Sequence, residues 1–194
     1  FGNGIRSLMR QDPDVILVGE IRDKDTATMG FRAAMTGHQV YSTLHTNSAI
    51  GAIPRLLDIG ILPDIMAGNI IGIIAQRLVR VLCPHCKYSY QPDHTERRLL
   101  GIRPDEEYKV YRAAGCDQCN HQGYKGRLAI MELLKMDSDL DDLVARRASI
   151  HDLKHAAQER GFRPLASDGL HRVLQGVTSL SEVARVVDLT DRMG

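Results

Sequence analysis

The sequence has no long hydrophobic run and no apolar segment at its start. Its longest apolar stretch, residues 65–75, is interrupted by Asn69, and a membrane-spanning helix needs roughly 18 to 20 apolar residues. The first ten residues lack the apolar core of a signal peptide and begin with Phe1 instead of Met. The start of the chain predicts an internal fragment or a processed chain. The lack of a long apolar run predicts a cytoplasmic protein without a transmembrane segment, and such a protein can still act peripherally at a membrane.

An excess of either charge is also missing. Lys and Arg total 25 and Asp and Glu total 24, which gives a formal net charge of +1. Binding to a phosphate backbone requires a basic surface, so we expect no nucleic-acid partner. The 194 residues are 43% hydrophobic and 25% charged, which excludes disordered and collagen-like chains and indicates a protein with a buried core.

The first part of the chain has an α/β pattern. Four consecutive apolar residues, 15–18, predict a central parallel strand that is buried on both faces. Residues 24–36 predict a helix, with Asp23 as its N-cap and Gly37 at its end. Residues 39–44 predict a second strand, which would complete a βαβ unit.

Two further helices are expected before the first cysteine. Thr46 or Asn47 can cap a helix that extends to Leu57. Another helix would begin at Pro63 and end near Gln76 and Arg77.

An acid and a histidine follow the two predicted strands. Glu20 comes after the first strand and His45 after the second, and ligands of α/β sheets bind at the carboxyl ends of strands. A hydrophobic strand that ends in an acid is typical of a Walker B motif, which holds Mg²⁺ or orients the attacking water. The alternative is an ordinary strand with a solvated acid at its end, together with histidines that have only structural hydrogen bonds.

All four cysteines occur in two CxxC pairs, and the pairs are 29 residues apart. Two such pairs can supply four thiolates to one structural Zn²⁺ ion. A c-type haem site would need a histidine after a pair, where this chain has Lys87 and Asn120, and disulfides are uncommon in cytosolic proteins. The predicted zinc ligands are Cys83, Cys86, Cys116 and Cys119.

The remaining sequence is predominantly helical. Residues 128–134 predict a strand or a strand–helix junction, and four helical patterns follow it. The helices begin near Asp137, Ser149, residue 164 and Ser179. The last one starts with an S-x-x-E sequence, in which Glu182 is expected to complete a capping box.

Several motifs together resemble one protein family. The segments VILVGEIRD at 15–23, TGH at 36–38 and STLHTN at 42–47 are similar to the ATPases of type II secretion and type IV pilus assembly. The segments at 120–127 and 163–186 resemble the same family in the same order. This resemblance implies a Walker B role for Glu20 and a phosphate-contacting role for His38 and His45.

One family motif is missing from the chain. A P-loop requires GxxxxGK[ST], and this sequence has no Gly-Lys dipeptide. In the family the P-loop, an acidic Asp box and the arginine fingers precede Walker B. The resemblance therefore implies the C-terminal half of a RecA-like P-loop ATPase core at residues 1–82. A tetracysteine zinc lobe at 83–127 and a helical subdomain at 128–194 would follow it.

The resemblance also implies partners and cofactors. The complete protein would be a homo-hexamer that uses ATP and Mg²⁺ and works with platform proteins of the bacterial inner membrane, and the fragment would be inactive alone. Gln76 and Arg77 are candidates for nucleotide contact, or for a structural role. The competing function is a non-catalytic, zinc-dependent protein-interaction module. The sequence leaves open whether the machine is a secretion system or a pilus.

Overall fold

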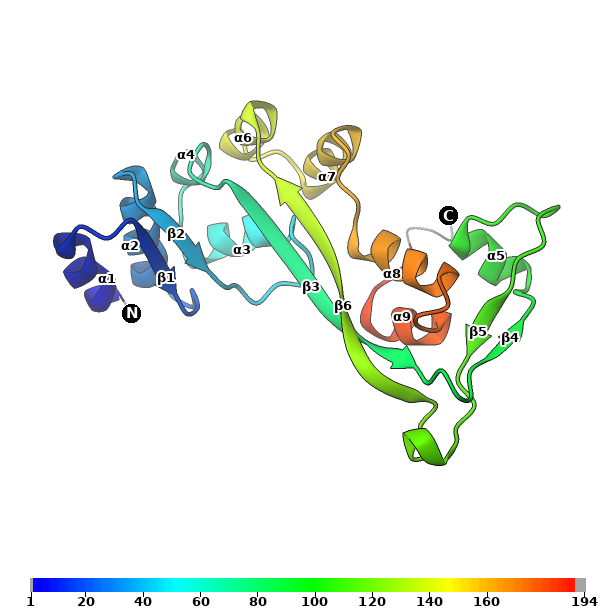
Figure 1. Ribbon diagram of the computed structural model, residues 1–194. Coiled ribbons are helices and arrows are strands. Elements are labelled where there is room, and N and C mark those ends of the chain that lie inside the picture. The colour runs from blue at the N-terminus through cyan, green and yellow to red at the C-terminus, as the bar shows by residue number, and fades with distance from the viewer. Residues whose placement is uncertain (1, 191–194) are drawn as a thin grey trace. The chain divides into compact units, whose positions relative to one another are not determined.

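The computed structural model describes residues 2–190, apart from the side chain of Asn3 (Figure 1). The helices are α1 Gly2–Leu8, η1 Met9–Gln11, α2 Lys24–Met35, α3 Ala52–Ile59, α4 Pro63–Met66, α5 His94–Leu100, η2 Asp117–Cys119, α6 Ser138–Ala145, α7 Ile150–Glu159, α8 Leu165–Leu174 and α9 Leu180–Val186. The strands are β1 Val15–Val18, β2 Gln39–Ser42, β3 Gly72–Leu82, β4 Tyr88–Tyr90, β5 Val110–Arg112 and β6 Tyr124–Lys135. The predicted mixture of helices and strands is confirmed.

The chain divides into two compact units, each made of two separate stretches of sequence. The first unit comprises Phe1–Ala75 and Leu133–Phe162, and the second comprises Gln76–Glu132 and Arg163–Gly194. Each unit has its own apolar core. In the first unit Ala27, Met66 and Leu140 are among the buried residues, and in the second Val110 and Val173 are fully buried. The division into segments 1–82, 83–127 and 128–194 stays a prediction.

Strands β1 and β2 form a two-stranded parallel sheet, with Val15 opposite Gln39 and Val18 opposite Ser42. The expectation that β1 is buried on both faces is wrong. Its burial alternates, and Leu17 is 76% exposed whereas Ile16 is 2% exposed. Because only one face of the strand packs against α2 and its neighbours, the other face of this sheet has no cover among residues 2–190.

Helix α2 begins and ends as the sequence predicts. The Asp23 carboxylate accepts hydrogen bonds from the Thr26 backbone amide at 2.8 Å and from the Thr26 hydroxyl at 3.0 Å. Gly37 adopts a positive φ of 96° just after the helix. The next helix begins later than expected, because Ser48 accepts a hydrogen bond from Gly51 in a turn that delays α3 until Ala52.

The predicted helix from Pro63 to Arg77 is wrong. Helix α4 is a single turn, after which Gly68 takes a positive φ of 74° and the Asn69 side chain donates to the Ile65 carbonyl at 3.0 Å. β-branched residues such as Ile73 dominate the following stretch, and these favour an extended conformation. Strand β3 therefore replaces the helix and pairs with β6, which runs in the opposite direction (Figure 1).

The four predicted C-terminal helices are confirmed as α6, α7, α8 and α9, and three of them have side-chain caps. Asp137 accepts from the Leu140 amide, Ser149 from the Asp152 amide and Ser179 from the Glu182 amide. Among residues 2–190, none of the helices combines the length and the apolar composition that crossing a lipid bilayer requires.

Candidate functional site

The first candidate site lies at the carboxyl end of the β1–β2 sheet, in the first unit. The pairing of the two strands continues past their last residues, because the Ile21 amide donates to the Thr43 carbonyl at 3.0 Å. The Thr43 hydroxyl in turn donates to the Gly19 carbonyl at 2.7 Å. Thr43 thus fixes the backbone on both sides of Glu20.

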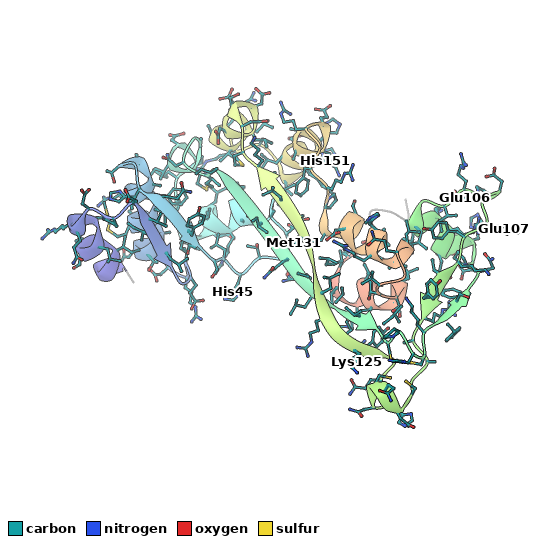
Figure 2. The ribbon with its side chains drawn as sticks, viewed as in Figure 1. His45, Glu106, Glu107, Lys125, Met131 and His151 are labelled. Carbon is teal, nitrogen blue, oxygen red and sulfur yellow. The ribbon has the colours of Figure 1, made fainter. Side chains whose placement is uncertain are left out.

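The structure brings Glu20 and His45 together. His45 Nε2 lies 3.3 Å from Glu20 Oε2, and the His45 side chain is 81% exposed, projecting from the segment after β2 (Figure 2). The same oxygen forms an ion pair with Arg22, whose Nε lies 2.6 Å away. The hydrogen bond from Arg22, with a smaller contribution from His45, holds the pKa of Glu20 below its ordinary value. Glu20 is therefore a carboxylate at neutral pH.

His38 lies at the end of α2 and makes different contacts. Its Nδ1 lies 3.0 Å from the Ala33 carbonyl and 3.1 Å from the Thr36 hydroxyl. Because a carbonyl can only accept, Nδ1 carries a proton in this arrangement and donates it to the Ala33 carbonyl. Among the described contacts, none joins His38 to Glu20.

Gln76 and Arg77 lie within strand β3 and not at the end of a helix. The Gln76 side chain is exposed and the Arg77 side chain is half-buried. Their contact with a nucleotide stays a prediction.

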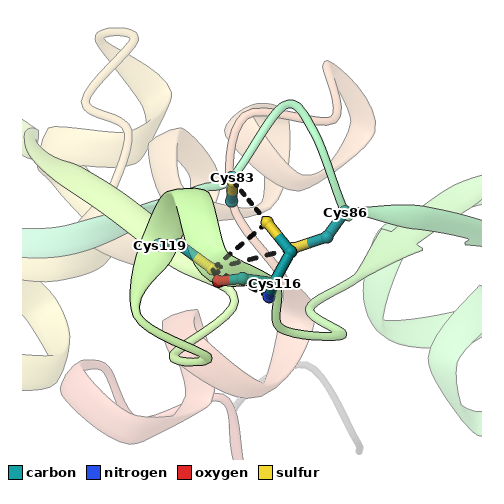
Figure 3. A group of neighbouring side chains, drawn as sticks. All are labelled: Cys83, Cys86, Cys116 and Cys119. Atoms are coloured by element: carbon teal, nitrogen blue, oxygen red, sulfur yellow. Dashed lines mark hydrogen bonds between the residues drawn. The ribbon is translucent and has the colours of Figure 1, made fainter.

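The second candidate site is a cluster of four cysteines in the second unit (Figure 3). Cys83 and Cys86 follow β3, whereas Cys116 immediately precedes the short helix η2 and Cys119 is the last residue of that helix. All four sulfur atoms lie within 4.8 Å of one another, and Cys83–Cys116, Cys86–Cys119 and Cys116–Cys119 are separated by 4.0, 3.8 and 3.8 Å. None of the four is in a disulfide.

These distances fit a tetrahedral zinc site. Four sulfur atoms placed 2.3 Å from one Zn²⁺ ion in a tetrahedron are separated by ~3.8 Å. Backbone amides also point at the sulfurs: those of Cys116 and Gly123 donate to Cys119 at 3.3 and 3.2 Å, and that of Gly115 donates to Cys86 at 3.3 Å. The donor set and its amide hydrogen bonds therefore suit thiolate ligands.

The amide hydrogen bonds also affect ionisation of the thiols. Burial opposes ionisation of Cys119, but the amides of Cys116 and Gly123 outweigh burial and lower its pKa to about 6. Burial raises the pKa of Cys116 to about 11. A cluster with one readily ionised thiol can begin to bind a cation at neutral pH, since metal ligands must be deprotonated.

Sequence reasoning missed the ion pairs of two charged residues. The first is Arg22, whose position two residues after Glu20 in an extended segment was the available signal. The second is Glu182, which is 1% exposed and accepts ion pairs from Arg80 at 2.6 Å and from Arg185 at 2.7 Å. The separation of 102 residues between Arg80 and Glu182 left no local signal in the sequence.

Comparison with known proteins points to one family. The family described as "Type II/IV secretion system protein" matches residues 1–185. The type IV pilus assembly ATPase TfpB of Acinetobacter baylyi is 48% identical over 194 residues, which cover 98% of this chain and 33% of that protein. The type II secretion system ATPase E of Vibrio cholerae is 47% identical over 190 residues, covering 96% of this chain and 37% of that protein. The chain thus spans about a third of the length of these relatives.

Solved structures show the same fold. The crystal structure of the Legionella pneumophila ATPase DotB matches with a TM-score of 0.63 at 21% identity, and the match covers 95% of this chain and 41% of that one. The Yersinia pseudotuberculosis ATPase DotB matches with a TM-score of 0.62 at 19% identity, covering 97% of this chain and 40% of that one. At these identities the likeness establishes the fold alone.

Proposed function

Because the chain belongs to the type II/IV secretion system protein family, we propose that it is the C-terminal part of a hexameric ATPase that powers type II secretion or type IV pilus assembly. Relatives at 47 and 48% identity carry those two functions in their names. The observation that carries the proposal is the Glu20–His45 pair at the carboxyl ends of two parallel strands, where α/β proteins bind ligands.

Each residue of this site has a proposed task. Glu20 orients the water that attacks the γ-phosphate of ATP and helps to hold Mg²⁺. His45 and His38 contact the phosphates, and Gln76 and Arg77 contact the nucleotide. Bound Mg²⁺ would neutralise charge that develops on the phosphate oxygens. The two-stranded sheet would belong to a RecA-like core.

The phosphate-cradling loop is supplied by another part of the complete protein. A P-loop provides most of the phosphate contacts through its backbone amides and its lysine, and this chain has no Gly-Lys dipeptide. We therefore expect residues 1–194 alone neither to bind ATP tightly nor to hydrolyse it.

The cysteine cluster is proposed to hold one structural Zn²⁺ ion. Cys83, Cys86, Cys116 and Cys119 would fill all four tetrahedral positions, which leaves none for a catalytic water. The ion would link the end of β3 to the segment around η2 and so order residues 83–127.

The proposed location is the cytoplasmic face of the bacterial inner membrane. The complete protein would be peripheral there, as a homo-hexamer bound to platform proteins of the secretion or pilus machine. Balanced charge gives no reason to expect a nucleic-acid partner.

ATP hydrolysis by the complete protein tests the proposal. We expect Mg²⁺-dependent turnover by the complete protein and none by residues 1–194, measured as phosphate release. A complete protein that contains zinc but never turns over ATP, with or without its membrane partners, would contradict the proposal. It would favour the second candidate, a zinc-dependent interaction module, which the cysteine cluster supports.

A further inference from the structure

Glu20 and Arg22 lie on the same side of the chain after β1. Hydrogen bonds to Thr43 hold Gly19 and Ile21, the residues on either side of Glu20, at 2.7 and 3.0 Å. In an extended segment the side chains of residues i and i+2 share a face. The Arg22 guanidinium therefore meets the Glu20 carboxylate directly, at 2.6 Å.

The two oxygens of the Glu20 carboxylate differ in their surroundings. Oε2 accepts from both Arg22 Nε and His45 Nε2, at 2.6 and 3.3 Å. Within residues 2–190, no donor contacts Oε1. The Glu20 side chain is 24% exposed, whereas those of Arg22 and His45 are 71 and 81% exposed. The carboxylate is thus anchored through one oxygen and open through the other.

Arg22 is the stronger of the two anchors. A charge-assisted hydrogen bond of 2.6 Å from a guanidinium is stronger than the 3.3 Å contact from the His45 imidazole. His45 is also assigned a contact with the phosphates in the proposed function, so holding Glu20 is not its only proposed task. Arg22 is therefore the main group that keeps the carboxylate in place.

We propose that Arg22 is a positioning residue, which fixes Oε2 of Glu20 so that Oε1 faces the water that attacks ATP. Arg22 acts through Glu20 and touches neither the water nor the nucleotide. The inference rests on the proposed function of Glu20, and it adds a residue that the Walker B pattern does not require.

Substitutions of Arg22 in the complete protein test this role. Arg22→Gln keeps a polar side chain but loses the charge, so we expect kcat to fall about tenfold, because orientation of the attacking water is worth about 10²- to 10⁴-fold in total. KM for ATP should change less than about twofold, because ground-state binding is untouched. Arg22→Lys keeps the charge and should recover most of the lost kcat.

Arg32→Gln is the matched control. Arg32 is an exposed arginine of α2, in the same unit, and has no ion pair with any described residue. We expect it to leave kcat, KM and the melting temperature unchanged. Arg22→Gln should also leave the melting temperature unchanged, since the side chain is mostly exposed.

Three results would overturn the inference. One is an unchanged kcat in Arg22→Gln, and another is a raised KM with normal kcat, which would make Arg22 a nucleotide contact. The third is an equal loss in Arg32→Gln. Glu20→Gln separates this inference from the proposed function. If that variant abolishes turnover and Arg22→Gln does not, only the inference fails, whereas normal turnover in Glu20→Gln rejects the function of Glu20 itself.

Discussion

Glu182 should stabilise the second unit strongly, although it touches neither candidate site. Its carboxylate is fully buried and accepts from the Arg80 backbone amide at 3.0 Å, from the Arg80 guanidinium at 2.6 Å and from Arg185 at 2.7 Å. Arg80 also stacks over the Tyr124 ring, at 4.2 Å from its centre. The carboxylate thus ties α9 to β3 and to β6.

The magnitude follows from the pKa of Glu182. Burial alone would raise that pKa, but the hydrogen bonds from Arg185 and Arg80 outweigh burial and lower it from 4.5 to about 2. Each unit by which the pKa of Glu182 is lower in the folded than in the unfolded protein is worth about 1.4 kcal/mol. Ionised Glu182 therefore contributes about 3 kcal/mol to the free energy of unfolding at neutral pH.

The perturbation is Glu182→Gln. The amide can still accept from the Arg80 backbone, and both guanidinium groups are about half exposed, so water can solvate them. We therefore expect a loss of about 2 to 3 kcal/mol at pH 7, below the roughly 3 to 5 kcal/mol for breaking a fully buried pair. Glu107→Gln is the control, because Glu107 is exposed in the segment between α5 and β5 (Figure 2).

The pH dependence has a definite sign. A carboxyl whose pKa is lower in the folded state stabilises the protein above its unfolded pKa and loses this contribution as pH falls toward the folded value. The difference in free energy of unfolding between wild type and Glu182→Gln should thus shrink by about 1 kcal/mol at pH 4 and by about 2 kcal/mol at pH 3.

The assay is urea unfolding followed by tyrosine fluorescence. The chain has no tryptophan, and five of its six tyrosines lie in residues 83–127, so the signal reports mainly the second unit. A difference below about 0.5 kcal/mol at pH 7, or a difference that is the same at pH 7 and pH 3, would refute the reasoning.

Three further outcomes are expected. Chelation should release one Zn²⁺ per chain and disorder residues 83–127, and less than half an equivalent of zinc in freshly purified, reduced protein would contradict the site. Cys83→Ser should lose zinc and lower the melting temperature, with unchanged nucleotide affinity in the folded complete protein. Gly176→Ala should cost at least about 2 kcal/mol in urea unfolding, since φ is +70° and a Cβ would lie 2.8 Å from Tyr111. Gly37→Ala, with φ +96° and open space, should cost less.

Local features of the sequence predicted much of the fold. Asp23, Asp137 and Ser149 cap helices where expected, because a cap depends only on residues three positions away. The two CxxC pairs meet as predicted, since four thiols at that spacing have few other uses.

Features that depend on distant residues could not be predicted. The apolar run after Pro63 is compatible with either a helix or a strand. Its later part forms strand β3 because it pairs with β6, which lies far away in the sequence. Glu182 was expected to complete a capping box. Ser179 does cap α9, but the Glu182 carboxylate instead turns to Arg80, which lies 102 residues earlier in the chain. Only the tertiary structure reveals that partner.

The resemblance to the secretion ATPases is confirmed by the family match over residues 1–185. The roles of Glu20, His45 and His38 stay proposals, although the structure places Glu20 and His45 within 3.3 Å of each other. Arg22 stands within the segment VILVGEIRD, but its contact with Glu20 was not predicted, because a pattern of residue types does not say which side chains meet.

The most direct test of the central claim is a paired measurement on Glu20→Gln in the complete protein. The substitution removes the charge but keeps the shape, so the affinity for Mg-ATP should stay within about threefold of wild type while turnover falls about 10²-fold or more. Glu107→Gln should change neither quantity. Normal turnover per folded molecule in Glu20→Gln, accompanied by a lower melting temperature, would show that Glu20 is a structural acid and would contradict the account.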